Sequence, residues 1–425
     1  MAREMKSSGV EWIGEIPADW SADRLQWHLE EIKVQNSPVQ SEQVLSLTIE
    51  SGVIPYEEKG NQGNKAKENY EEYKLAYPDT LVVNSMNVII GAVGISKYFG
   101  CVSPVYYVFR VTEGTDLRYI YYLFTNVGFQ KEMRKYAKGI LEIRLRISAS
   151  DMLKRIIPKP SYEEQCRISD FLDKKCAEID AVIEKTKATI EEYKKLKQSV
   201  ITEAVTKGIR SNRAMKNSGN LWYGEIPSDW DIRKLKYMFQ IKKDIAGKEG
   251  YTVLSITQRG IMPKNIASNE GQIAENYSNY QLVEPGDFAM NHMDLLTGWV
   301  DISKYNGVTS PDYRVFVLLD KENNHNQYYL YLMQMCYTNR IFYGLGQGVS
   351  GMGRWRLQAD KFLNFTIPVP SYEEQKEIAE YLDKKCAEID SLIAKKTNLL
   401  TELENYKKSL IYEYVTGKKE CSERG

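Results

Sequence analysis

Two long segments of the chain carry mostly apolar residues at alternating steps of four and three. The first set is Leu172, Cys176, Ile179, Ile183, Thr186, Ile190, Tyr193, Lys197, Val200 and Ala204. The second set is Leu382, Cys386, Ile389, Ile393, Lys396, Leu400, Leu403, Lys407, Leu410 and Tyr414. Charged residues fill the positions on either side. This spacing is typical of a coiled coil. It predicts two long helices, at 161–208 and 371–417, that can pair with each other. An antiparallel pair would relate the two repeats by a pseudo-two-fold axis.

The ends of both segments carry helix start and stop signals. Ser161 precedes Glu164 by three residues, and Ser371 precedes Glu374 in the same way, which is the pattern of a capping box. Gly208 and Gly417 stand where a helix closes in a left-handed cap. At about 1.5 Å per residue, the first helix is expected to be roughly 70 Å long.

The chain also repeats itself at an offset of 210 residues. "DKKCAEID" occurs at 173–180 and again at 383–390, and "SGVEWIGEIPADW" at 8–20 returns as "SGNLWYGEIPSDW" at 218–230. Between these anchors the two copies differ widely. A repeat that is alike at its ends and unlike in its middle indicates one scaffold presenting two different surfaces.

The middle of each copy has the pattern of a mixed domain. Short β-branched and aromatic runs such as "TLVVNSMNVII" and "DYRVFVLL" predict strands. The segments 117–138 and 326–344 predict helices whose aromatic faces belong to the core. The predicted fold is therefore α+β, with mixed α/β domains at 1–160 and 209–370. The long helices 161–208 and 371–417 separate them in an internal pseudo-two-fold repeat, and 418–425 is a short tail.

Composition limits the possible classes of protein. The chain has 425 residues, of which 43% are hydrophobic, so it is expected to form two or more globular domains. It has no apolar run long enough to span a membrane, no signal-peptide pattern at its start, and six cysteines without close pairing, which predicts a cytoplasmic protein with reduced thiols. Basic and acidic residues number 57 each, so binding to an anionic partner must use local patches.

Motifs for catalysis are weak or absent. "FYGLGQGVSG" at 342–351 resembles a methyl-donor or dinucleotide loop, but a predicted helix precedes it and the basic "RWRL" follows. The Asn/Asp-Pro-Pro-Tyr/Phe motif of adenine methyltransferases is missing. Asp19 with Glu31 and Lys33 imitates a nuclease site only loosely, the three histidines lack metal-ligand spacing, and no phosphate loop occurs. We expect no catalytic centre, metal site or bound cofactor in this chain.

Binding signals are stronger. Residues 131–155 contain eight basic and three acidic side chains. The pair Arg144 and Arg146 alternates in "EIRLRIS", which predicts one face of a strand, and Arg354 and Arg356 recur at the same offset. Forked guanidinium groups suit phosphates and the guanine edge. The alternatives are that these arginines are a shared structural lock or ion-pair partners, and that the amide-rich loops 58–69 and 289–296 are ordinary turns. The candidate DNA-binding residues are Lys59, Asn61, Gln62, Asn64, Lys65, Lys97, Lys138, Arg144, Arg146, Arg259, Asn291, His292, Lys304, Gln347, Arg354 and Arg356.

These motifs resemble the specificity subunit of type I restriction–modification enzymes. The resemblance rests on "SGVEWIGEIPADW", a variable domain, "IPKPSYEEQCRISDFLDKKCAEIDAVI" and a long helix, all repeated once. It implies two target-recognition domains that each read one half of a bipartite double-stranded DNA site. It further implies that the coiled coil fixes their spacing and docks two methyltransferase subunits.

The same resemblance assigns the chemistry to other chains. Methyltransferase subunits are expected to bind S-adenosylmethionine, and restriction/translocase subunits to use ATP and Mg, while this chain is non-catalytic and has no membrane partner. Two alternatives remain open: a non-enzymatic scaffold whose domains bind proteins, and the specificity subunit of a methylation-only system.

Overall fold

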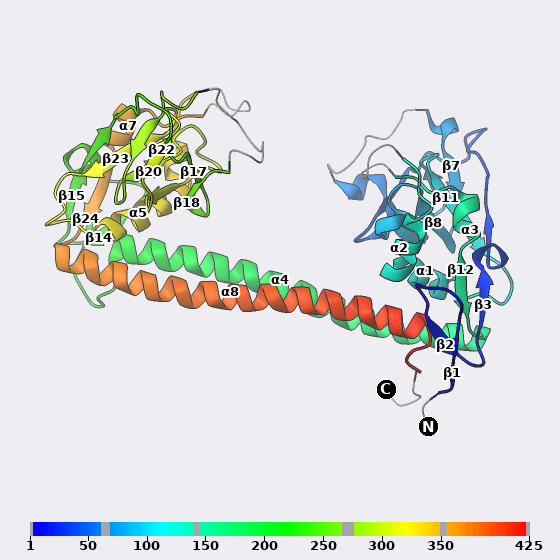
Figure 1. The fold of residues 1–425 in the computed structure, drawn as a ribbon. Helices are drawn as coiled ribbons and strands as arrows, with labels where there is room; N and C mark the ends of the chain where they lie inside the picture. Colours follow the sequence, from blue (N-terminus) through cyan, green and yellow to red (C-terminus); the bar gives the residue numbers. More distant parts are fainter. Residues whose placement is uncertain (1–2, 61–68, 140–144, 266–275, 349–354, 422–425) are drawn as a thin grey trace. The chain divides into compact units, whose positions relative to one another are not determined.

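A computed structural model describes residues 3–60, 69–139, 145–265, 276–348 and 355–421 (Figure 1). The chain divides into two compact units. Unit 1 is Met1–Lys187 with Asn398–Gly425, and unit 2 is Ala188–Thr397. Each unit contains one mixed domain and one half of each long helix. This division differs from the linear order of domains expected from the sequence, because the two halves of each long helix pack against different domains. No described helix is long and apolar enough to cross a membrane.

The two long helices are α4 (Tyr162–Lys207) and α8 (Tyr372–Val415). Their first turns are capped by serine, since the Ser161 Oγ accepts the Glu164 N–H at 3.3 Å and the Ser371 Oγ accepts the Glu374 N–H at 3.4 Å. The expected second half of each capping box does not form, because both glutamate side chains bind arginine and tryptophan instead. Left-handed glycines follow both helices, with φ of 76° at Gly208 and 72° at Gly417.

The helices pair in antiparallel directions. In unit 1, the Lys407 Nζ lies 2.6 Å from both carboxylate oxygens of Asp180. In unit 2, the Lys197 Nζ lies 2.8 and 2.7 Å from those of Asp390. The partner's number on α8 falls as the number on α4 rises, which is the mark of an antiparallel pair. The predicted coiled coil and the repeat are confirmed. The buried seam residues are Leu172, Cys176, Ile179, Ile183, Thr186, Ile190, Ala204, Leu382, Cys386, Ile389, Leu410 and Tyr414.

The domain of unit 1 is built on a four-stranded antiparallel sheet of order β4-β11-β8-β9, flanked by four two-stranded sheets. The strands of the central sheet are β4 (Leu29–Glu31), β11 (Tyr106–Val111), β8 (Thr80–Asn84) and β9 (Val93–Ser96). The two-stranded pairs are β1 (Met5–Ser7) with β2 (Glu15–Pro17), β3 (Ser21–Arg24) with β12 (Ile156–Lys159), β5 (Leu45–Thr48) with β6 (Gly52–Pro55), and β7 (Lys74–Ala76) with β10 (Gly100–Val102).

Unit 2 repeats this plan with the sheet order β16-β23-β20-β21. The central strands are β16 (Phe239–Lys242), β23 (Arg314–Leu318), β20 (Phe288–Met290) and β21 (Val300–Ile302). The two-stranded pairs are β13 (Met215–Asn217) with β14 (Glu225–Pro227), β15 (Asp231–Lys234) with β24 (Thr366–Val369), β17 (Leu254–Thr257) with β18 (Gly260–Pro263), and β19 (Gln281–Val283) with β22 (Gly307–Thr309).

Both predicted domain helices are interrupted. The segment 117–138 forms α1 (Leu117–Thr125) and α2 (Val127–Arg134), because the Asn126 side chain accepts the N–H groups of the next helix and so begins it. The segment 326–344 forms α5 (Asn326–Thr338) and α6 (Ile341–Gly344), which are separated where Arg340 adopts a left-handed φ of 57°. The short helices α3 (Ala149–Leu153) and α7 (Ala359–Asn364) precede the last strand of each domain.

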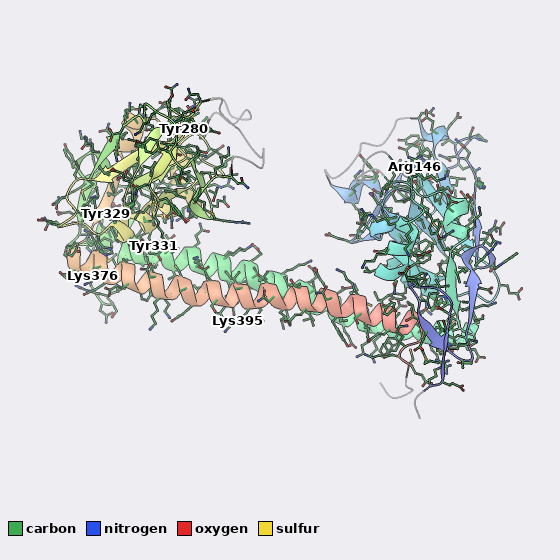
Figure 2. The ribbon with its side chains drawn as sticks, in the orientation of Figure 1. Arg146, Tyr280, Tyr329, Tyr331, Lys376 and Lys395 are labelled. Atoms are coloured by element: carbon green, nitrogen blue, oxygen red, sulfur yellow. The ribbon has the colours of Figure 1, made fainter. Side chains whose placement is uncertain are left out.

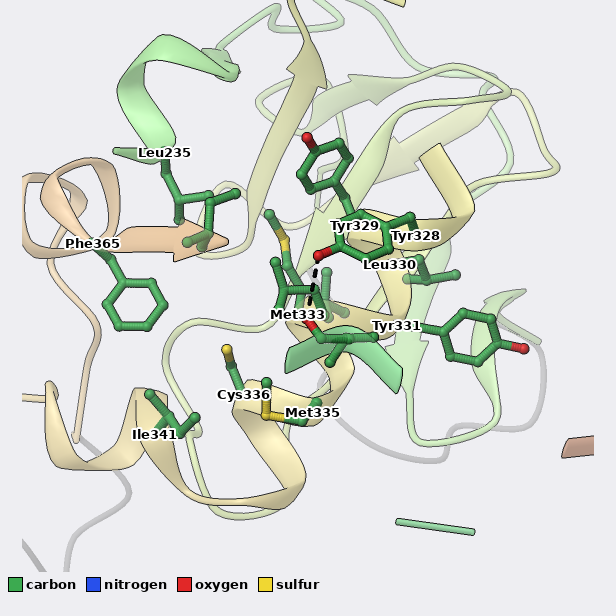
Figure 3. Close-up of a cluster of buried hydrophobic side chains, with 14 of the residues drawn as sticks. Leu235, Tyr328, Tyr329, Leu330, Tyr331, Met333, Met335, Cys336, Ile341 and Phe365 are labelled. Carbon is green, nitrogen blue, oxygen red and sulfur yellow. Dashed lines mark hydrogen bonds between the residues drawn. The ribbon is translucent and has the colours of Figure 1, made fainter. Parts of the chain in front are cut away.

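A buried tyrosine fastens each domain to the last turns of a long helix. The Tyr328 hydroxyl, drawn with its hydrogen bond in Figure 3, lies 3.2 Å from the Val205 carbonyl oxygen. It also lies 3.3 Å from the Pro368 carbonyl oxygen. In unit 1 the Tyr119 hydroxyl contacts the carbonyls of Val415 and Pro158 in the same way, at 2.9 and 3.1 Å. The aromatic stripes on α1 and α5 are therefore core, as the sequence predicted.

A second repeated contact fastens the start of each mixed domain to the start of a long helix. In unit 2 the Glu374 carboxylate, only 2% exposed, pairs with Arg213 and accepts the Trp230 indole N–H at 3.0 Å. In unit 1 Arg3 and Trp20 hold Glu164 at 2.6 and 2.8 Å. Asp19, the acid of the loose nuclease pattern, accepts from Arg3 at 2.7 Å and so takes part in this scaffold contact.

Candidate nucleic-acid interface

In unit 2, four of the sequence candidates gather at one edge of the central sheet. Asn291 and His292 directly follow β20. The His292 carbonyl accepts the Leu357 N–H at 3.0 Å, and next to Leu357 the backbones of Arg356 and Gln347 exchange hydrogen bonds at 2.9 and 3.0 Å. The side chains of Arg356 and Gln347 are exposed. The sheet therefore brings together two loops that lie more than fifty residues apart in the sequence.

Unit 1 builds the same edge from the same backbone contacts, with a partly different set of side chains. The Ser85 carbonyl accepts the Ile147 N–H at 3.1 Å, and the backbones of Lys138 and Arg146 exchange hydrogen bonds at 2.8 and 2.9 Å. Arg146 and Lys138 are exposed and form no ion pair with another described residue. Figure 2 labels Arg146 on this domain.

The predicted arginine pairs are only partly described by the structure, and the strand expected around them needs correction. Arg146 and Arg356 sit in isolated β-bridges, so the expected strand does not form among the described residues around them. Arg144 and Arg354 fall outside the described residues, as do Asn61, Gln62, Asn64 and Lys65.

Other candidates lie elsewhere. Lys97 follows Ser96, which pairs with Thr80 at the start of β8, so Lys97 is at the opposite end of the sheet from Ser85. Lys304 lies beyond β21, whose Ile302 pairs with Phe288 at the start of β20, and is equally far from the His292 end.

Two further candidates, Arg259 in unit 2 and Lys59 in unit 1, lie at or just after a β-hairpin. Arg259 is in the turn between β17 and β18, where the neighbouring Gln258 side chain donates to the Thr297 carbonyl at 3.3 Å. This contact places the turn next to the loop that begins at His292. In unit 1, the Lys59 ammonium lies 4.4 Å from the centre of the Tyr56 ring.

The basic segment 131–155 is partly neutralised within the fold. Lys135 pairs with Glu11 at 2.8 Å and with Glu132 at 3.0 Å. The Arg155 guanidinium lies 3.3 Å from the centre of the Tyr136 ring. Lys135 and Arg155 therefore have structural partners, whereas the exposed Lys138 and Arg146 form no ion pair with another described residue.

The sequence reading missed Arg314, the first residue of β23. Its side chain is buried, with 5% exposed, and its Nη2 donates to the Leu357 carbonyl at 2.8 Å. Its guanidinium carbon lies 4.9 Å from the centre of the Phe362 ring. Burial lowers the pKa of Arg314 to about 10, so it stays charged at neutral pH.

His292 is kept neutral mainly by burial, and Arg314 adds to this effect. Burial, followed by the positive charges of Arg314 and Arg356, lowers the pKa of the His292 imidazole to about 4. Within "DYRVFVLL" the arginine resembles any outward-facing polar residue of a strand. A residue-by-residue comparison of the two repeats places Tyr107 at the equivalent position in unit 1. Only such a comparison could have singled out Arg314 from the sequence.

The described residues contain no group of three or more His, Cys, Asp or Glu side chains able to hold a metal ion. Cys176 and Cys386 are buried free thiols in the coiled-coil seam, and burial raises the pKa of Cys176 to about 11. A thiol that stays protonated at neutral pH is a poor nucleophile.

Comparison with known proteins identifies the family. The model of the type I restriction modification DNA specificity domain matches residues 31–192 and 227–404. The type I restriction enzyme MjaVIII specificity subunit of Methanocaldococcus jannaschii is 29% identical over 62% of this chain, a match that spans 61% of that protein. A second protein of the same organism, provisionally named the type I restriction enzyme MjaX specificity subunit, is 25% identical over 96% of this chain and 95% of its own length.

Solved structures agree on the fold. A chain from a study of complex assembly and conformational transition in the type I R-M system has a TM-score of 0.69 at 14% identity, covering 95% of this chain and 99% of its own. The HsdS subunit from Thermoanaerobacter tengcongensis has a TM-score of 0.51 at 14% identity, covering 95% and 98%. The two matched domains together span most of the chain and confirm the predicted resemblance. This chain therefore belongs to the family of type I restriction–modification DNA specificity subunits.

Proposed function

We propose that the chain reads a bipartite double-stranded DNA target, with one half-site for each unit. One observation carries this proposal. Both units build the same sheet edge from the same backbone contacts and share its arginine, Arg146 or Arg356, yet the other polar side chains on it differ: Ser85 and Lys138 in one, and His292 and Gln347 in the other. A shared frame with different polar side chains suits two readers of different sequences, because base edges are distinguished by hydrogen-bond donors and acceptors.

The exposed arginines of this edge are the main candidates for DNA contact. Arg146 and Arg356 form no ion pair with another described residue, so their five-donor forks are available to phosphates or to guanine. The chain has a formal net charge of zero, so part of the positive surface that holds DNA is assigned to partner proteins.

Partners are also assigned the chemistry. The coiled coil is proposed to dock two methyltransferase subunits that bind S-adenosylmethionine, together with restriction/translocase subunits that use ATP and Mg. Because the complex is proposed to act on cellular DNA, we place it in the cytoplasm. Purified chain alone is expected neither to methylate nor to cleave DNA, since its 425 residues lack the methyltransferase and phosphate-loop motifs.

Methylome sequencing tests the proposal directly. Cells with and without the gene should differ by the loss of methylated adenines at one bipartite motif with two constant half-sites and a fixed spacer. Replacing unit 2's domain by that of another family member should change one half-site only. An unchanged methylome, or a change in both half-sites, contradicts the proposal.

The coiled coil is further proposed to act as a ruler between the half-sites. Thr189 falls between Asp180 and Lys197 along α4, and Leu399 falls between Asp390 and Lys407 along α8. One heptad inserted after each residue keeps the seam in register. Each helix then grows by about 10 Å at about 1.5 Å per residue.

Because duplex DNA rises about 3.4 Å per base pair, the spacer should lengthen by about three base pairs. Affinity should also fall, since three base pairs turn the far half-site by roughly 100°. The half-sites themselves should not change. An active variant with the old spacing, or with altered half-sites, contradicts the ruler.

A further inference from the structure

Unit 2 buries a positive charge that has no carboxylate partner. Arg314 is 5% exposed, and no described acidic side chain lies within ion-pair distance of it. Its Nη2 donates to the Leu357 carbonyl, but its Nη1 is buried and has no hydrogen-bond partner among the described residues. Burying an unpaired charge is costly, and a buried donor without an acceptor adds to the cost.

The groups around Arg314 add positive charge and unused hydrogen-bonding capacity. The Nδ1 of His292 is buried and also has no partner among the described residues. The exposed guanidinium of Arg356 acts on the same imidazole. The acid on this loop, Asp294, forms no ion pair with them; its Oδ1 is turned to the loop backbone, where it accepts the N–H groups of Leu296 and Thr297.

Unit 1 demonstrates that the fold does not need this charge. The residue there is Tyr107, whose hydroxyl donates to the Ile147 carbonyl at 3.2 Å, just as Arg314 donates to the equivalent carbonyl of Leu357. The residue in place of His292 is Ser85. A neutral side chain therefore satisfies the same carbonyl, and what the arginine adds in unit 2 is positive charge.

We propose that Arg314, His292 and Arg356 form an anion site, absent from unit 1, that receives a backbone phosphate of the DNA half-site read by unit 2. A phosphate offers the negative charge and the acceptor oxygens that this cluster lacks. The exposed Arg356 meets the phosphate at the surface, and Arg314, which Leu357 and the Phe362 ring hold below it, adds its charge from beneath. A base edge fits less well, because Arg314 cannot extend into a groove. This inference rests on the proposed function, since DNA supplies the phosphate.

Arg314→Tyr is the decisive variant, because it copies the solution of unit 1 and keeps a donor for the Leu357 carbonyl. Binding of the cognate duplex by the full chain, assembled with the proposed methyltransferase subunits, is measured by fluorescence anisotropy between about 50 and 200 mM salt. Losing one phosphate contact should reduce the salt slope by about 0.9 and weaken binding about eightfold at about 0.1 M salt.

Two further variants guard against a folding artefact. Arg356→Gln changes an exposed side chain and should reduce the slope by a similar amount. Lys234→Gln removes an equal charge from β15, which pairs with β24 beside the long helix, and should leave the slope unchanged. An unaltered slope in Arg314→Tyr, or an equal loss in Lys234→Gln, overturns the proposal.

Histidine NMR of the full chain separates DNA phosphate from free phosphate. The chain has three histidines, so the ring signals can be assigned by substitution. The cognate duplex should shift the His292 signal in the wild type and not in Arg314→Tyr, whereas a shift with inorganic phosphate alone would reassign the site to a free anion. If the wild type fails to bind any specific duplex, the proposed function fails. If it binds normally while Arg314→Tyr has the same slope, only this site fails.

Discussion

Lowering the pH from 7 to 4 should destabilise unit 2 through His292, and His292→Ser should remove that part of the effect. The substitution copies Ser85, which occupies the equivalent position of unit 1. In the folded chain the pKa of His292 is lowered to about 4, first by burial and then by Arg314 and Arg356. An unfolded histidine titrates near about 6.5.

The sign of the effect follows from which state binds the proton. Between about pH 6.5 and 4 the unfolded chain takes up a proton at this residue while the folded chain does not. Stability is therefore greatest above the unfolded pKa, falls as the pH drops through this window, and levels off below about 4. At about 1.4 kcal/mol for each pH unit the full window corresponds to about 3 kcal/mol, and the partial exposure of the ring reduces this to about 2–3 kcal/mol.

The measurement is urea unfolding of the full chain at a series of pH values, for the wild type, His292→Ser and Arg314→Tyr. The difference in unfolding free energy between wild type and His292→Ser should grow steadily from pH 6.5 to 4. Other titrating groups are common to both proteins, so their contributions cancel. Arg314→Tyr should show a smaller dependence, because one of the two positive charges that lower this pKa is gone. A difference that stays constant with pH would refute the assigned charge state of His292.

The remaining predictions concern the scaffold and the reading edge. Arg213→Ala should cost about 3–5 kcal/mol, because it leaves the Glu374 carboxylate buried without its partner. Arg3→Ala should cost less, since its glutamate partner is more exposed. Both are measured by chemical unfolding. Tyr328→Phe should cost about 1–3 kcal/mol in the same assay, since two buried carbonyls lose their donor. Arg146→Ala should weaken cognate DNA binding by about 1–3 kcal/mol through a lost base contact, and an equal weakening for cognate and mutated half-sites would contradict that role.

Elements set by local pattern could be predicted from the sequence. The helices α4 and α8 are an example, because their apolar seam, serine starts and glycine ends are set by residues within a few turns of each other. The structure places these features at the positions that the heptad spacing predicts. The aromatic faces of α1 and α5 are buried for the same reason. The interruptions at Asn126 and Arg340 were not predicted, because continuous apolar periodicity hides a side-chain cap and a left-handed residue.

Contacts between distant segments were beyond the reach of the pattern. Glu164 and Glu374 have the spacing of a capping box, but tertiary structure offers them arginine and tryptophan partners that hold a carboxylate more strongly than one backbone N–H. Lys97 and Lys304 match the composition of a DNA contact, yet strand register carries both to the end of the sheet away from Ser85 and His292.

The sequence by itself determined the repeat, the paired long helices and the family, because identity at a fixed offset and heptad spacing need no knowledge of the fold. Only the tertiary structure decided which side chains share the reading edge. His292 and Arg356 meet because antiparallel pairing and the Leu357 hydrogen bond bring their loops together, and Arg314 joins them because β23 runs beside β20. The charge of that edge depends on the distances between these side chains and on their burial, and neither can be derived from the order of residues along the chain.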